Sequence, residues 1–144
     1  MSDDEQRLAT PADEDLAWLA ARRKLVEALY GSGFLGSQYQ TVEGKLAAVQ
    51  PVLGLMKQKP DFLRLLQGMG IVLGDAFCQE FGMTWVMVED WYGRDPALAL
   101  PGTSVLLFPL AMISKRVERG EEFEVADLFH GVGGEIRRVV SEGA

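Results

Sequence analysis

Hydrophobic side chains recur at helical spacing along most of this chain, and the longest such run covers residues 61–81. There the apolar side chains fall on one wide stripe of an α-helix, and Gly82 follows as a residue type that ends helices. Shorter stripes predict further helices over residues 12–30, 109–119 and 125–141. For residues 109–119, a continuation of the preceding strand is the alternative.

The run that begins at Thr41 has the same period but contains Pro51. A proline inside a helix removes one hydrogen bond and costs about 3 kcal/mol. The sequence therefore predicts either one kinked helix or two short ones, closed by residues 57–60.

A different pattern lies between the helical runs. Residues 84–91 alternate large apolar side chains and are rich in aromatic and β-branched types, which favours a strand. A short second strand is predicted at residues 98–100, and a third at residues 104–108.

Two turns connect these predicted strands. Gly93 and the Asp95-Pro96 step disfavour helix and suit a reversal at residues 93–95. Pro101-Gly102 suits the two central positions of a type II turn. The simplest arrangement is a three-stranded antiparallel meander packed against about five helices, which is an α+β fold.

The length of 144 residues fits a single domain, because a chain of this size buries enough surface to form an ordinary core. Hydrophobic residues at 48% and charged residues at 24% argue against disorder. Within the domain we expect a flexible acidic tail over residues 1–12, a helical part over residues 13–60, and a helix–meander–helix part over residues 61–144.

The formal net charge of −7 opposes long-range attraction to nucleic acid and to anionic lipid. No apolar run approaches the roughly 18 residues that a membrane-spanning helix needs, and the N-terminus lacks the pattern of a signal peptide. The single cysteine, Cys78, excludes an intramolecular disulfide. We therefore expect a cytoplasmic protein that binds neither nucleic acid nor membrane.

One corner of the predicted fold gathers polar side chains. In a meander the first turn and the exit of the third strand lie at the same end of the sheet, so Asp90, Arg94 and Asp95 are expected near the start of the next helix. Ser114 and Lys115 lie further along that helix. Free backbone N–H groups at the helix start, together with Arg94, suit a small anion or a carboxylate. The alternative is a structural corner in which Arg94 pairs with Asp90 and Asp95 caps a turn or the helix.

Trp85 and Trp91 share one face of the first predicted strand. Core packing is the ordinary role of such aromatic residues. If the two side chains are exposed instead, they would mark a surface for a protein partner, since large apolar patches are uncommon on monomers.

No residue is assigned a catalytic role, and neither a metal nor a cofactor is expected. Zinc and iron sites usually need three or four nitrogen or sulfur ligands, whereas this chain has only His130 and Cys78. The glycines at positions 68, 70 and 74 lie inside a predicted helix, so they do not match a dinucleotide-binding fingerprint. Gly70 and Gly74 are expected to admit the close passage of a neighbouring strand or helix.

Several short motifs in the C-terminal half resemble a bacterial domain family of unknown function. They are Leu73-Gly74, Trp85, Gly93-Arg94-Asp95-Pro96-Ala97-Leu98, Phe108-Pro109, Lys115-Arg116-Val117-Glu118 and Gly120. The resemblance covers about residues 70–129 and implies a bacterial, cytosolic protein. It implies no catalytic residue.

Two classes of function remain. The preferred one is a non-catalytic protein-interaction or regulatory module, whose partner is another protein or a second copy of this chain. The alternative is a small-molecule or anion-binding domain, conceivably an enzyme, with its site at residues 90–95 and the start of the helix over residues 109–119.

Overall fold

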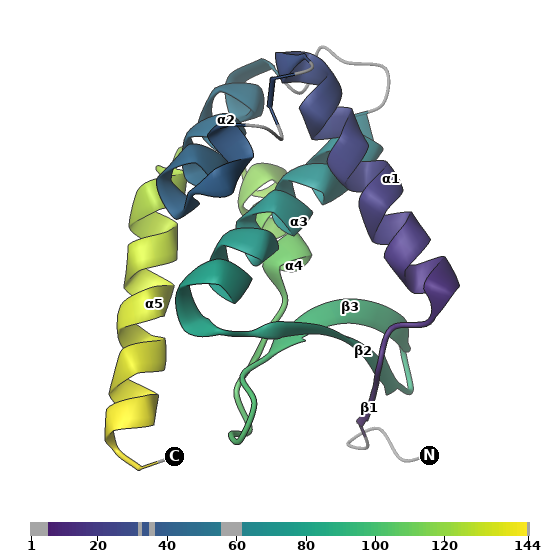
Figure 1. Ribbon diagram of the computed structural model, residues 1–144, viewed down its shortest axis with the longest axis vertical. Coiled ribbons are helices and arrows are strands. Elements are labelled where there is room, and N and C mark those ends of the chain that lie inside the picture. Colours follow the sequence, from purple (N-terminus) through teal and green to yellow (C-terminus); the bar gives the residue numbers. More distant parts are fainter. Residues whose placement is uncertain (1–5, 32, 35–36, 56–61, 144) are drawn as a thin grey trace.

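A computed structural model describes residues 6–31, 33–34, 37–55 and 62–143 of the chain (Figure 1). Its elements, in chain order, are β1 (Arg7–Ala9), α1 (Asp13–Tyr30), a 3-10 helix η1 (Gln38–Gln40), α2 (Val42–Leu55), α3 (Phe62–Phe81), β2 (Thr84–Asp90), β3 (Gly93–Ala99), β4 (Leu106–Leu107), α4 (Pro109–Glu118) and α5 (Val125–Ser141).

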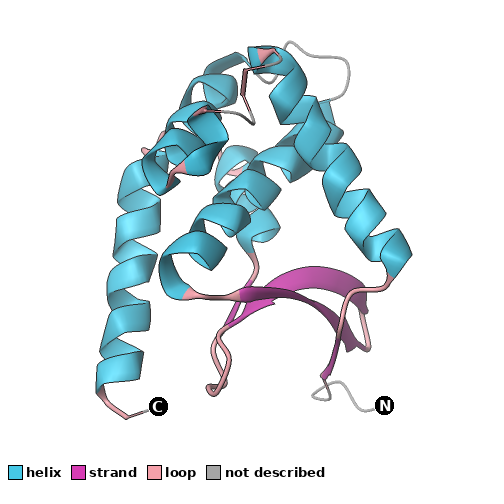
Figure 2. Ribbon diagram, viewed as in Figure 1, coloured by secondary structure: helices cyan, strands magenta, loops and turns pink. Residues whose placement is uncertain are grey.

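The strands form one antiparallel sheet in the order β1-β2-β3-β4, and the helices gather on one side of it (Figure 2). Helix α3 runs through the middle of the helical layer and contacts α1, α2, α4 and α5. This arrangement confirms the predicted α+β fold. Within the described residues, none of the helices combines the length and apolar character needed to cross a lipid bilayer.

The predicted helices are confirmed, and α5 begins and ends at the predicted residues. Residues 109–118 form helix α4, so the alternative of a longer strand is wrong there. Pro51 lies inside one uninterrupted helix, α2, and its ring is exposed. The predicted closure of that helix at residues 57–60 lies outside the described residues.

The prediction of three strands missed β1. This strand pairs with β2 in the register Arg7 to Glu89, Leu8 to Val88 and Ala9 to Met87. It lies within the segment for which a flexible tail was expected. At three residues it is too short to show an alternating pattern in the sequence. It is recognised as a strand only because it pairs with the edge of β2.

The first turn and the second strand were also placed too late in the chain. The turn has Trp91 and Tyr92 at its tip, and residues 93–95 already belong to β3. Pro96 is tolerated in this strand because β4 pairs only with Leu98 and Ala99, which leaves β3 an edge strand at position 96. The third strand is shorter than predicted. The type II turn at Pro101-Gly102 is confirmed, since Thr103 N donates to Leu100 O and Gly102 has φ +82°.

The glycines of α3 are packing sites, as predicted. A Cβ atom at Gly70 would lie 2.5 Å from the Cα of Leu110, and one at Gly74 would lie 2.5 Å from the ring of Trp85. These glycines let the start of α4 and the start of β2 approach the axis of α3. They therefore fix where the first turn of α4 sits relative to the sheet.

Candidate functional site

The tip of the β2–β3 hairpin presents two large aromatic side chains to solvent. Trp91 is 61% exposed and Tyr92 is 83% exposed. Within the described part of the chain, neither side chain makes a hydrogen bond or a ring contact. The turn itself is held by Asp90, whose Oδ1 accepts the backbone N–H of Tyr92 at 2.8 Å. The aromatic rings are therefore displayed by a fixed turn whose hydrogen bonding does not depend on them.

Arg94 ties this hairpin to the start of α1. Its Nη1 and Nη2 donate to the two carboxylate oxygens of Asp15, with Nη2 at 2.7 Å from Oδ2, and its Nε donates to Oε1 of Glu89 at 3.0 Å. Asp15 is 9% exposed and also accepts the backbone N–H of Ala12 at 2.7 Å, which helps α1 begin. A bidentate pair of this kind sets the orientation of both groups. It fixes the aromatic tip relative to α1.

The hydrogen bonds from Arg94 and from Ala12 lower the pKa of the Asp15 carboxyl from 3.8 to about 2. The pKa is lower in the folded protein than in the unfolded chain, so the stabilisation from this group is complete above pH 3.8. It is lost as the pH falls through about 2.

We therefore expect wild-type protein to lose stability more steeply than Asp15→Asn as the pH falls from about 4 to about 2, because the variant lacks this titration throughout. Urea denaturation at a series of pH values measures the effect. Arg94→Gln should make the free energy of unfolding less dependent on pH in the same way, because it removes the guanidinium that pairs with Asp15. If the free energy of unfolding fell with pH equally in all three proteins, the acid titration would not come from the Asp15–Arg94 pair.

A surface cavity of about 330 Å³ lies beside the pair, between α1, α3, the hairpin and the start of α4. Its apolar lining consists of Trp18, Leu19, Met87, Pro96 and Leu110. Its polar lining consists of Asp15, Gln67, Arg94 and Asp95. The volume is at the lower end of the range for small-ligand pockets.

The structure brings only part of the predicted polar corner together. Arg94 and Asp95 line the cavity along with the first turn of α4, but Ser114 and Lys115 do not, and Lys115 borders a different hollow. Asp90 is engaged with the turn. Arg94 pairs with Glu89 and Asp15, so the suggested pairing with Asp90 is wrong. Asp15, the acid that Arg94 reaches across the fold, was missed, because no local pattern links positions 79 residues apart.

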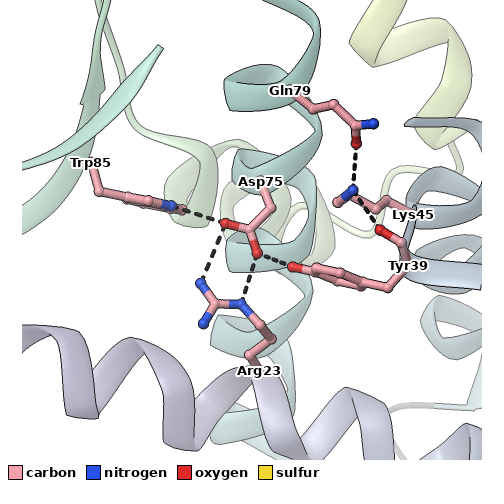
Figure 3. A network of polar contacts seen from close by, with 6 residues as sticks. All are labelled: Arg23, Tyr39, Lys45, Asp75, Gln79 and Trp85. Carbon is pink, nitrogen blue, oxygen red and sulfur yellow. Dashed lines mark hydrogen bonds and ion pairs between the residues drawn. The ribbon is translucent and has the colours of Figure 1, made fainter. Parts of the chain in front are cut away.

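Trp85 lies at the start of β2 and Trp91 lies in the turn just after that strand, so the two do not form one patch. The Trp85 side chain is half-buried, and its indole N–H donates to Oδ1 of Asp75 at 3.0 Å (Figure 3). Trp85 therefore packs inside the fold, while Trp91 is displayed to solvent.

Asp75 lies at the centre of a second polar network, which sequence reasoning missed (Figure 3). Besides Trp85 from β2, it accepts hydrogen bonds from Arg23 of α1, whose Nε lies 2.7 Å from Oδ2, and from the hydroxyl of Tyr39 in η1. The Asp75 side chain is only 15% exposed. One carboxylate thus joins four elements of the fold. The cavity beside the Arg94–Asp15 pair is not lined by any residue of this network, which fits a structural role.

Lys45 of α2 and Cys78 of α3 are the other reactive groups near this network. Lys45 is 6% exposed, donates to Tyr39 O at 2.6 Å and to Gln79 Oε1, and has its pKa lowered by burial. Burial, reinforced by the nearby Asp75, raises the pKa of the Cys78 thiol to about 12. The thiol is therefore protonated at neutral pH, which disfavours a nucleophilic role. Among the described residues, no group of three or more His, Cys, Asp or Glu side chains is placed to hold a metal ion.

Comparison with known proteins identifies a family. The model of the family described as "Domain of unknown function (DUF3806)" matches residues 54–129. The chain belongs to the DUF3806 family. No curated protein matches the chain.

The fold recurs in a crystal structure of a protein from Bacteroides thetaiotaomicron VPI-5482, with a TM-score of 0.69 and 16% sequence identity. The match covers 91% of this chain and 48% of that chain, so this chain spans about half the length of its structural relative. At this identity the likeness concerns the fold alone.

The DUF3806 segment supplies only part of each network described above. It contains α3, the hairpin and α4, and hence Asp75, Trp91 and Arg94. Asp15 and Arg23 come from α1, which lies outside the segment. The cavity and the Asp75 network are therefore both built at the junction between the family segment and the helices that precede it.

Proposed function

We propose that this DUF3806 protein is a non-catalytic protein-interaction module whose contact surface is the tip of the β2–β3 hairpin and the adjoining cavity. The observation that carries the proposal is the exposure of Trp91 and Tyr92 on a fixed turn. Turns of this kind are ordinarily made by small polar residues, so the turn does not require two aromatic side chains. Trp and Tyr are among the residues that contribute most to binding energy at protein interfaces.

The surrounding surface supports the same function. Leu8 and Leu16 are also at least half exposed, so four of the seven exposed large hydrophobic side chains in the described residues belong to β1, the first turn of α1 and the hairpin tip. These three elements lie close together in Figure 1. Apolar exposure concentrated in one region is typical of a contact surface.

Arg94 gives no comparable support to the alternative of an anion site. Its Nε, Nη1 and Nη2 all donate to carboxylates of the protein itself. A bound anion would have to compete with Asp15 and Glu89 for these donors. The interaction module is therefore the function that we favour.

Affinity capture from a lysate of the source organism, quantified by mass spectrometry, tests the proposal. We expect Trp91→Ala/Tyr92→Ala to lose proteins that the wild type retains, with a melting temperature close to that of the wild type, because exposed substitutions change stability by only about 0.5 kcal/mol. Leu63→Ala is the matched control, since Leu63 is 69% exposed on another part of the surface. Recovery of the same proteins by all three forms would refute the proposal.

A further inference from the structure

We infer that the partner presents an extended cationic segment, whose Lys or Arg side chains contact Trp91 and Tyr92 and enter the cavity beside them. This inference rests on the proposed function and specifies the chemistry of its partner. It is carried by three features of the same corner: the sign of its charge, the exposed aromatic faces and the lining of the cavity.

The charge around the hairpin is negative. Residues 7–22 and 89–95 together contain six carboxylates and three arginines, a net charge of −3. The carboxylates are Asp13, Glu14, Asp15, Glu89, Asp90 and Asp95. Two of the arginines already have partners, because Arg94 is bound to Asp15 and Glu89, and Arg22 donates to Gln67 and lies over the Trp18 ring.

Some of these carboxylates are available to a partner. Asp13, Glu14 and Asp95 are exposed, and none of the three forms an ion pair with another described residue. Opposite charge at such a surface speeds association and orients the incoming chain. A partner segment with positive charge is therefore favoured over a neutral or acidic one.

The aromatic tip adds a short-range attraction for the same groups. Cations are drawn to the faces of Trp and Tyr rings, and Trp91 and Tyr92 leave most of their surface accessible. Tyr92 is two residues from Arg94, which lines the cavity, so at about 3.3 Å per residue the tip and the cavity lie within about 7 Å along the backbone. A single extended segment can therefore reach both.

The cavity suits a long basic side chain. Lys and Arg combine an aliphatic stem with a charged end. The wall formed by Leu19, Met87 and Leu110 can cover the stem, while the exposed carboxylate of Asp95, which has no ion-pair partner among the described residues, receives the positive end. A side chain without a stem, or one with a negative end, would match only part of this lining.

The test uses fluorescence anisotropy with a labelled peptide of alternating arginine and serine, and a control peptide with glutamine in place of arginine. We expect the wild type to bind the arginine peptide, and to bind it more weakly as salt is raised. Asp13→Asn/Glu14→Gln/Asp95→Asn should weaken binding about tenfold, since each exposed charge contributes modestly. Trp91→Ala/Tyr92→Ala should weaken it to a similar extent.

A charge-matched variant separates a defined site from general attraction to an acidic protein. Glu121→Gln/Glu122→Gln/Glu124→Gln removes the same number of carboxylates from the loop before α5. The inference requires this variant to bind like the wild type. Equal weakening by the two triple variants, or equal binding of the glutamine peptide, would overturn it.

The remaining outcomes distinguish the inference from the proposed function. If no peptide binds but capture of a protein still depends on Trp91 and Tyr92, the cationic partner is wrong and the interaction module survives. If capture is also independent of the tip, both are wrong. Concentration-dependent NMR shifts of the Trp91 indole without peptide would assign the surface to a second copy of the chain and overturn the inference.

Discussion

Asp75→Ala is expected to lower the free energy of unfolding by about 2 to 4 kcal/mol, because removing one member of a largely buried ion pair leaves the other charge without compensation. Arg23, the hydroxyl of Tyr39 and the indole N–H of Trp85 would all lose their acceptor. The value lies below that of a fully buried pair because the Arg23 side chain is 25% exposed and can turn toward water. Urea denaturation followed by far-ultraviolet circular dichroism measures the change.

Two further variants complete that experiment. Asp75→Asn removes the charge but keeps an acceptor oxygen, so it should lower the free energy of unfolding by less than Asp75→Ala does. Glu118→Ala removes an exposed carboxylate at the end of α4, where none of the described residues pairs with it, and should change stability by no more than about 0.5 kcal/mol. If Asp75→Ala were as stable as Glu118→Ala, the network would not be a stabilising element.

Gly70→Ala is expected to destabilise the protein by about 1 to 3 kcal/mol, even though alanine is the better helix former. The new Cβ would lie 2.5 Å from the Cα of Leu110 and 3.0 Å from its backbone nitrogen. A backbone cannot rotate away as a side chain can, so α3 and α4 would have to separate. Thermal denaturation should show a lower melting temperature.

Gly134→Ala is the matched control in α5. A Cβ at that position meets no atom within 4 Å, so the gain in helix propensity of about 0.5 to 1 kcal/mol should appear as increased stability. The two substitutions are chemically identical and should act with opposite sign. A stabilising Gly70→Ala would show that the close approach between α3 and α4 relaxes at little cost.

The helices were predictable from sequence because each has a polar and an apolar side over several turns. Helix α5 shows this best, since its stripe overrides three interior glycines. The strands were less predictable because they are short and bordered by ambiguous residues. β1 has only three residues, and the Asp95-Pro96 step is compatible with β3 only because β4 does not reach that far.

Only those residues of the candidate site that lie close together in the sequence, around the β2–β3 turn, were predictable. Positions 94 and 95 stood out as charged residues beside a turn, and Trp91 as an aromatic residue in the same stretch. The partners that were missed, Asp15 for Arg94 and Arg23 and Tyr39 for Asp75, come from α1 and η1, at least 36 residues away. Hydrophobic periodicity shows on which face of a helix a residue lies, but not which other helix or strand packs against that face. The period of α3 puts Asp75 opposite the apolar stripe, but it does not reveal which residues bind its carboxylate.

The Asp75 network has a consequence for the family segment taken by itself. The family segment begins at residue 54, yet the carboxylate in its interior is neutralised by a guanidinium from residue 23. A copy of the segment without its preceding helices would leave that carboxylate without the guanidinium, so we expect it to be less stable than the segment joined to α1. The stretch matched by sequence similarity is therefore narrower than the part of the fold that this ion pair holds together.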